Sequence, residues 1–156
     1  MAVKEEKQNL FASIQIVCFK IGVEEYGIDI LQVQEILKLP SVTKLPKSNP
    51  YIMGVMDLRG KVIPIVDLSI RFGIRSGKDQ KKTRAIVVDI GGKQVGLAID
   101  SVSHVIKVNS GEIEPPPPVV KGISGKYIVG IAKLEGGFVV ILDIHKIFSS
   151  DEVAGM

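Results

Sequence analysis

The stretch YIMGVMDLRGKVIPIVDLSIRF, residues 51–72, decides the fold because the chain contains it a second time. Residues 127–148 read YIVGIAKLEGGFVVILDIHKIF, and 8 of the 22 aligned positions are identical. Several of the other positions exchange one aliphatic residue for another, such as Val55 for Ile131 and Val66 for Leu142. The upstream segments align as well, with residues 21–38 matching residues 90–107. Because self-similarity of this kind is typical of repeated structural units, the chain is predicted to hold two copies of one motif.

Each copy is predicted to contain five short strands and one helical turn. Apolar runs rich in Val and Ile, with glycine between them, favour strands and tight turns. Residues 30–37 fit both a helical turn and a strand, and Pro64 within a strand argues for an edge or a bulge. The expected strands are 14–21, 24–30, 34–39, 53–58 and 61–67 in the first copy and 84–90, 93–99, 103–108, 130–134 and 137–143 in the second, with helical turns at 68–72 and 144–148.

Five strands in about 70 residues favour a small barrel, since closure removes exposed strand edges. A barrel of that size rarely supplies more than ~3–5 kcal/mol of stability alone, so we expect the two lobes to share an apolar seam and to enclose a binding groove. The predicted fold class is mainly β, with two pseudo-repeated five-stranded barrels and a few short helical turns. We expect one domain of two lobes over 12–149, the first barrel within about 12–74, the second within 83–149, a connecting loop at 75–82, an N-terminal extension at 1–11 and a C-terminal tail at 150–156.

Composition excludes several classes of protein. The chain is 46% hydrophobic with a net charge of +3, which is too small to indicate a nucleic-acid partner by itself. The basic segment 71–84 fits a solvated connecting loop, and a docking patch for an acidic partner is the alternative. No apolar stretch approaches the ~18 residues of a membrane span, and the start of the chain lacks a signal-peptide pattern. We therefore expect a cytoplasmic protein with no direct membrane insertion.

Residues suited to catalysis are scarce. The single cysteine, Cys18, lies in an apolar run and is interpreted as a buried core residue. The two histidines, His104 and His145, show neither a nucleophile signature nor zinc-ligand spacing with it. Asp67 and Asp143 occupy the same position in the two copies and are interpreted as caps of the following turn. We expect no catalytic residue, no cofactor and no metal, which leaves a binding module.

The repeat also acts as an internal control for function. Arg59, at the tip of the first hairpin, corresponds to Glu135 in the second copy, so the hairpin can be built without arginine. Glu35 likewise corresponds to His104. Residues that differ between the copies at such positions are not dictated by folding alone. A solvated arginine without a role and a binding arginine both remain open on this evidence.

The motif G-V-x-x-L-R-G-x-x-I-P-x-x-D-L at residues 54–68, with EEYGIDILQVQEIL at 24–37 and QVGLAIDSVSHVI at 94–106, resembles the CheW family of chemotaxis coupling proteins. The resemblance covers residues from about 12 to 149. It implies two SH3-like five-stranded barrels and a non-enzymatic adaptor that couples the cytoplasmic tips of chemoreceptors to the histidine kinase CheA and supports control of its autophosphorylation. The end of the chain soon afterwards favours a free-standing coupler.

The resemblance also implies where partners bind. Six residues would face the receptor tip, namely Val33, Glu35, Ile36 and Arg59 from the first copy and Val102 and Val105 from the second. We hypothesise that Arg59 and Glu35 form an ion pair at the groove's edge. Residues that face the regulatory domain of CheA are not assigned. We expect a monomer in isolation that joins rings and arrays in complex, and the alternative is a small-barrel nucleic-acid binder using residues 71–84.

Overall fold

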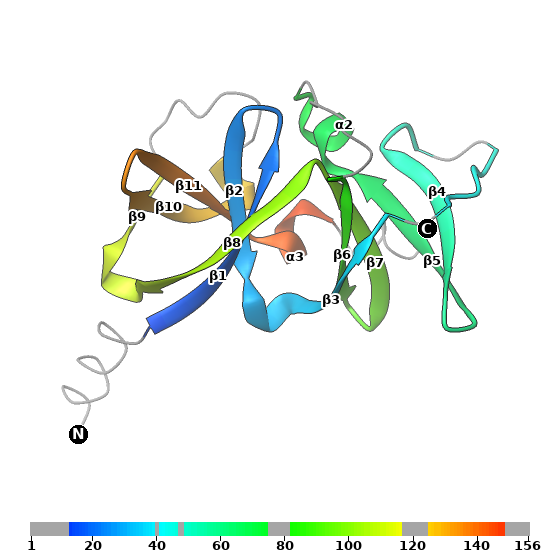
Figure 1. Cartoon of the computed structure of the whole chain (residues 1–156), viewed down its shortest axis with the longest axis horizontal. Coiled ribbons are helices and arrows are strands. Elements are labelled where there is room, and N and C mark those ends of the chain that lie inside the picture. The colour runs from blue at the N-terminus through cyan, green and yellow to red at the C-terminus, as the bar shows by residue number, and fades with distance from the viewer. Residues whose placement is uncertain (1–12, 40, 47–48, 75–81, 117–124, 149–156) are drawn as a thin grey trace.

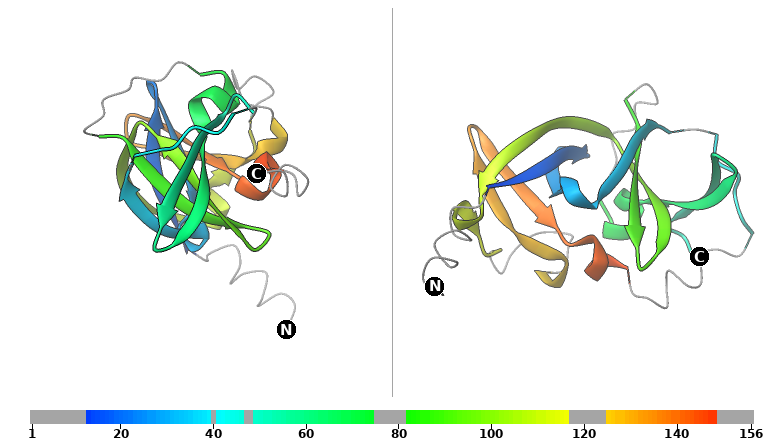
Figure 2. Two further views of the ribbon diagram at one scale, coloured as in Figure 1. Left: turned by 90° about the vertical axis from the view of Figure 1, so that its right-hand side faces the viewer. Right: turned by 90° about the horizontal axis from the view of Figure 1, so that it is seen from below.

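The computed structural model describes residues 13–39, 41–46, 49–74, 82–116 and 125–148. Two curled β-sheets lie side by side along the long axis of the molecule (Figure 1), and the view from below at the right of Figure 2 shows the same division. Two short helices, α2 (Leu68–Phe72) and α3 (Ile144–Ile147), complete the described elements together with three 3-10 turns. The expected N-terminal extension, C-terminal tail and most of the connecting loop lie outside the described residues.

The first sheet and its turns form lobe A, and the second sheet forms lobe B. Lobe A has the strand order β8-β1-β2-β11-β10-β9 and lobe B the order β3-β6-β7-β5-β4. The strands are β1 (Ser13–Ile21), β2 (Glu24–Asp29), β3 (Val33–Lys38), β4 (Ile52–Leu58), β5 (Lys61–Asp67), β6 (Arg84–Ile90), β7 (Lys93–Ile99), β8 (Ser101–Asn109), β9 (Ile113–Glu114), β10 (Ile128–Leu134) and β11 (Gly137–Leu142).

The two copies of the motif exchange strands, which corrects the expected assignment of one barrel to each half of the chain. Lobe A takes β1 and β2 from the first copy and β8 to β11 from the second. Lobe B takes β3 to β5 from the first copy and β6 and β7 from the second. Each lobe is thus completed by the other half of the chain, and neither half forms a lobe by itself.

Corresponding strands of the two lobes pair through corresponding residues. Val33 lies opposite Val88, and its counterpart Val102 lies opposite Phe19, the counterpart of Val88. Both of these strand pairs carry a β-bulge at the same point, after Val33 and after Val102. The parallel pairs match too: Ile65 opposite Gly96 in lobe B, Ile141 opposite Gly27 in lobe A. The two lobes are therefore two instances of one topology, and the predicted fold class, a mainly β protein with two pseudo-repeated SH3-like barrels, is confirmed. Lobe B has the expected five strands, whereas lobe A has six, because the short strand β9 pairs with β10 at its edge.

A shared core joins the lobes. The largest buried cluster draws on both sheets and both helices, as the expected apolar seam requires. Each lobe also has a smaller cluster of its own, on the other face of its sheet. The shared cluster includes Val17, Phe19, Ile21, Tyr26 and Ile28 from lobe A, Val66, Ile86, Val88, Ile90, Val95, Leu97 and Ile99 from lobe B, and Leu68, Phe72, Ile144, Ile147 and Phe148 from or beside the helices.

Local sequence signals are confirmed at several points. The Asp67 carboxylate accepts hydrogen bonds from the N–H groups of residues 69 and 70, and the Asp143 carboxylate accepts them from those of residues 145 and 146, so both aspartates cap the helices that follow them. Residues 30–37 satisfy both interpretations, because a 3-10 turn at Ile30–Gln32 leads directly into β3. The expected edge or bulge at Pro64 is wrong, because β5 is an inner strand and the register shift of the β4–β5 pair falls between Ile52 and Gly54. The parallel ladder with β7 begins one residue after Pro64, so the proline removes no donor from that ladder.

Arg71 departs from the interpretation of residues 71–84 as a solvated loop. Its guanidinium donates to the carbonyl oxygen of Ile147 at 2.9 Å and to the hydroxyl of Tyr127 at 3.3 Å. The side chain is part of the contact between the two copies of the motif. Residues 75–81 of the basic segment lie outside the described residues.

Candidate functional site

The tip of the β4–β5 hairpin is a two-residue turn in which both central residues have positive φ. Arg59 has a φ of 51° and Gly60 a φ of 85°, as a type I′ turn requires. Among the described residues, Arg59 is the one non-glycine residue with positive φ. Its counterpart Glu135 lacks this conformation. Because the left-handed region disfavours side chains, the first copy holds Arg59 in a strained backbone that the repeated fold does not need.

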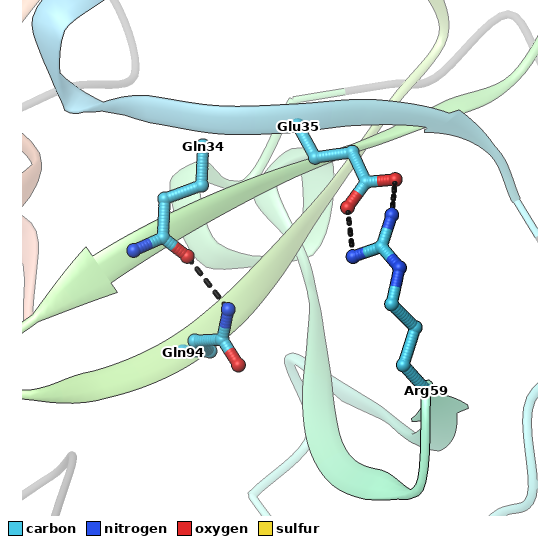
Figure 3. A network of polar contacts seen from close by, with 4 residues as sticks. All are labelled: Gln34, Glu35, Arg59 and Gln94. Carbon is cyan, nitrogen blue, oxygen red and sulfur yellow. Dashed lines mark hydrogen bonds and ion pairs between the residues drawn. The ribbon is translucent and has the colours of Figure 1, made fainter.

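The Arg59 side chain extends from this turn to β3 and meets Glu35 (Figure 3). Its two terminal nitrogens donate to the two carboxylate oxygens at 2.8 and 2.6 Å, which is a bidentate pair. The hypothesised ion pair is therefore confirmed. Hydrogen bonding to Glu35, together with its charge, raises the pKa of Arg59. The Arg59 side chain is 72% exposed, and a pair so exposed contributes little to folding stability.

Next to this pair, Gln94 Nε2 donates to Gln34 Oε1 at 2.7 Å and ties β3 to β7 (Figure 3). Gln34 is the extra residue of the β-bulge in β3. Since β3 is an edge strand of lobe B, with a neighbouring strand on one side alone, these two side-chain contacts hold that edge in place. Bulges commonly re-aim side chains in this way next to functional sites.

The four apolar candidates form two matching pairs on the two edge strands β3 and β8. Side chains directly opposite each other in an antiparallel pair share a face, and all four partners belong to the shared core. Val33 and Val102 pack against that core, whereas Ile36 is 40% exposed and Val105 is 50% exposed. The partners of Val33, Ile36, Val102 and Val105 are Val88, Ile86, Phe19 and Val17.

Glu35 lies on the other face of β3. Its partner Val87 belongs to the cluster that is private to lobe B. The structure therefore brings Glu35 and Arg59 together, and it packs Val33 and Val102 against the same core. The ion pair lies on the opposite face of β3 from Val33 and Ile36. A depression of about 490 Å³ has Val102 among its lining residues but none of the other five candidates.

Cys18 is fully buried, as expected of a core residue. Burial first, and the charge of Glu25 second, raise the pKa of its thiol to about 12. At pH 8 its thiolate fraction is about a thousandfold lower than that of a thiol in the unfolded chain. This agrees with the expectation that Cys18 is not a nucleophile.

A thiol reagent at pH 8 is accordingly expected to label the native protein at least about a hundredfold more slowly than the protein in denaturant. Absorbance of the released chromophore measures both rates. Rapid labelling of Cys18 in the native protein would contradict the buried, protonated thiol.

Sequence reasoning missed one constellation. Cys18, Glu25 and His104 lie on three neighbouring strands and approach one another in lobe A. Their spacing along the chain gives no metal-ligand pattern, and the pairing of β1 with β8 joins the two copies. The repeat could have indicated this cluster, because the residues of all three positions differ in lobe B.

The two repeated β lobes carry paired polar residues and matched apolar residues on the edge strands β3 and β8. Such an arrangement is typical of a protein that binds other proteins, that is, an adaptor. The model of the CheW-like domain family matches residues 15–152, and the chain belongs to this family.

Relatives and a solved structure agree with that assignment. The chain is 35% identical to the chemotaxis protein CheW of Treponema pallidum, an alignment that covers 98% of this chain and 89% of that protein. It is 36% identical to CheW of Klebsiella aerogenes over 90% of this chain and 84% of that protein. The crystal structure of the scaffolding protein TtCheW from Thermoanaerobacter tengcongensis superposes with a TM-score of 0.83 at 40% identity, covering 90% of this chain and 91% of that chain.

These comparisons make the chain a coupling adaptor of bacterial chemotaxis and favour this role over nucleic-acid binding. Within the described part of the chain, no helix combines the length and the apolar character needed to cross a bilayer.

Proposed function

We propose that this chain works without catalysis and joins the cytoplasmic tips of chemoreceptors to the regulatory domain of the histidine kinase CheA, so that receptors control autophosphorylation of the kinase. The observation that carries the proposal is Arg59. It occupies a strained turn conformation, reaches across to Glu35 in a bidentate pair, and does so in one copy of a repeat that folds without it. Strain of this kind is typical of functional positions.

The receptor tip, a helical hairpin, would dock against the edge strands by the helix-in-groove mode. Val33, Ile36, Val102 and Val105 would supply its apolar contacts, because the two strands present matching residues next to the shared core. The pair of Glu35 and Arg59 would supply polar contacts from the other face of the same edge strand, β3. Depletion of charge at the centre and polar groups at the rim are the usual anatomy of such contacts.

CheA would dock at the outer ends of the lobes. Val62 and Phe138 occupy the same position of the repeat, near the two hairpin tips, and are 72% and 58% exposed. A partner that docks on both lobes would cover these two equivalent apolar side chains. Lobes that meet end to end with the similar lobes of a partner generate rings and arrays. In the cell the protein would then be cytoplasmic and recruited to the receptors, and in isolation a monomer.

Arg59→Ala tests the receptor surface. We expect the free energy of unfolding to change by less than about 0.5 kcal/mol, because the ion pair is exposed. Receptor binding is expected to weaken roughly tenfold, the effect of losing an ordered interface arginine. The measurement is receptor-dependent phosphorylation of CheA in a reconstituted complex, with chemical denaturation of the free protein alongside.

Glu135→Ala is the matched control, since Glu135 holds the same turn position in the other lobe. It should leave receptor coupling unchanged. Full coupling by the Arg59→Ala protein would refute the proposed surface, and a stability loss of several kcal/mol would show that Arg59 is structural.

A further inference from the structure

Three neighbouring strands of lobe A each direct one metal-ligating side chain to the same place. Cys18 of β1 lies directly opposite His104 of β8, and Glu25 lies on β2, the strand on the other side of β1. The thiol sulfur, a carboxylate oxygen and an imidazole nitrogen all lie within 4.8 Å of one another. Because each ligand comes from a paired strand, the backbone under this trio is rigid, as a metal site requires.

The trio contains an unsatisfied oxygen. Glu25 Oε1 is buried and has no hydrogen-bond partner. His104 Nδ1 lies 3.6 Å away, too far for a hydrogen bond. A buried carboxylate oxygen without a partner is costly and rare. The same separation is close to the ~3.4 Å between two ligand atoms that share a tetrahedral zinc ion.

Lobe B shows that the fold does not require the trio. The positions that correspond to Cys18, Glu25 and His104 hold Val87, Gln94 and Glu35. There Gln94 is hydrogen-bonded to Gln34, and Glu35 is paired with Arg59. Lobe B thus satisfies its polar groups with protein partners, whereas lobe A gathers a thiol, an imidazole and a carboxylate with one buried oxygen that lacks a hydrogen bond.

We propose that Cys18, Glu25 and His104 bind a divalent ion of the zinc class. Thiolate, imidazole and carboxylate are the three ligand types that zinc takes in proteins. Glu25 and His104 line the depression of about 490 Å³, which gives an ion and a fourth, water ligand access from solvent, and Cys18 forms the buried end of the site. On binding, the thiol gives its proton to solvent and the sulfur forms the bond to the metal.

The charges around the site are compatible with a cation of this kind. Lys20, Lys82 and Arg84 also line the depression. A bound divalent ion balances the thiolate and the carboxylate. The three ligands and the ion then have no net charge beside the three cationic side chains. The proposed metal site does not depend on the proposed role of the protein as an adaptor.

Titration of the full, untagged chain with Co²⁺, a spectroscopic stand-in for zinc, tests the site. We expect a thiolate-to-cobalt charge-transfer band in the near ultraviolet, one ion per chain, and loss of the band when Zn²⁺ is added. Cys18→Val should abolish the band, and this change imports the residue that lobe B packs at the same position. Glu25→Gln, which imports the residue of lobe B, and His104→Gln should each weaken binding at least tenfold.

His145→Gln is the control, because His145 is the other histidine and lies outside the trio. Its Co²⁺ affinity should equal that of the unchanged protein. Circular dichroism establishes that each variant is folded. The proposal is overturned if no charge-transfer band forms, if the band survives in folded Cys18→Val protein, or if Glu25→Gln and His104→Gln bind Co²⁺ as the unchanged protein does. His104 and Glu25 would then be a simple ion pair.

Discussion

Gly54→Ala is expected to lower the free energy of unfolding by about 3–5 kcal/mol, the sum of backbone strain and overpacking. Gly54 has a φ of 149°, a region that side chains rarely adopt. A Cβ atom there would collide with the carbonyl group of Thr43. Thr43 cannot retreat, because its N–H and C=O are both bonded to Val55 at 2.9 Å. The strand β4 and the segment before it can approach so closely because residue 54 has no side chain.

Gly60→Ala is the matched control on the same hairpin. Gly60 also has a positive φ, but a Cβ atom there meets nothing within 4 Å, so we expect a loss of about 1 kcal/mol from backbone strain alone. Denaturant titration of both variants gives the two values. Equal losses would mean that close approach at Thr43 does not matter and that strain explains both.

The repeat made Gly54 predictable as a required residue, but not the reason for it. Its counterpart Gly130 meets the same constraint, since a Cβ atom there would collide with Ile113 and with the carbonyl oxygen of Glu114. The segments that cross at these two glycines, around Thr43 and at β9, were not predicted, because they are too short to show a strand pattern. Gly60 lies in a tight turn between two apolar runs, as the sequence pattern predicts, whereas Gly54 lies within β4 and makes room for the carbonyl group of Thr43.

The exchange of strands between the copies could not be predicted for a physical reason. The hairpins β1–β2 and β4–β5 would form both in a chain with one barrel per half and in the observed chain with exchanged strands. The two copies also present nearly the same apolar pattern. Whether β2 pairs with β5 or with β11 therefore leaves the local signals unchanged. The partner that the chain selects, β11, is known from the three-dimensional pairing alone.

The candidate site shows the same limit. Arg59 stood out because the repeat lacked it, and its partner Glu35 came from the family resemblance. The approach of His104 to Cys18 depends on β8 pairing with β1, a contact between copies that no local pattern contains. Residues that differ between the copies pointed to the candidate site. Contacts between strands that come from different copies could not be predicted from the sequence.

Arg71 lies where the two copies meet. Its guanidinium stands 5.4 Å from the ring centre of Tyr51 and 5.4 Å from that of Tyr127, and these tyrosines are counterparts in the repeat. It also donates to the carbonyl oxygen of Ile147, the counterpart of Arg71 itself. A side chain that contacts its own counterpart lies where the two copies of the motif meet, and the copies differ at this position, with arginine in one and isoleucine in the other.

Arg71→Met is expected to lower the free energy of unfolding by about 2 kcal/mol. Two cation–π contacts contribute about 0.5–1 kcal/mol each, and the bond to the Ile147 carbonyl contributes about 1 kcal/mol. The buried Nε atom, which has no hydrogen-bond partner, offsets part of this sum. The same substitution should raise the pKa of Tyr127, because the hydrogen bond from Arg71 is the main cause that lowers it. Denaturant titration and tyrosinate absorbance at alkaline pH measure the two effects.

Lys126→Met is the control that distinguishes the contact of Arg71 with both copies from the mere loss of a positive charge near Tyr127. Lys126 also lies over the Tyr127 ring, at 5.0 Å, but it is exposed and contacts one copy of the pair. Its removal should cost less than about 0.5 kcal/mol and raise the pKa of Tyr127 less than Arg71→Met does. If both substitutions had the same effect on stability, Arg71 would be an ordinary surface cation. A larger loss for Arg71→Met means that one guanidinium between two counterpart tyrosines holds the exchanged halves of the chain in register.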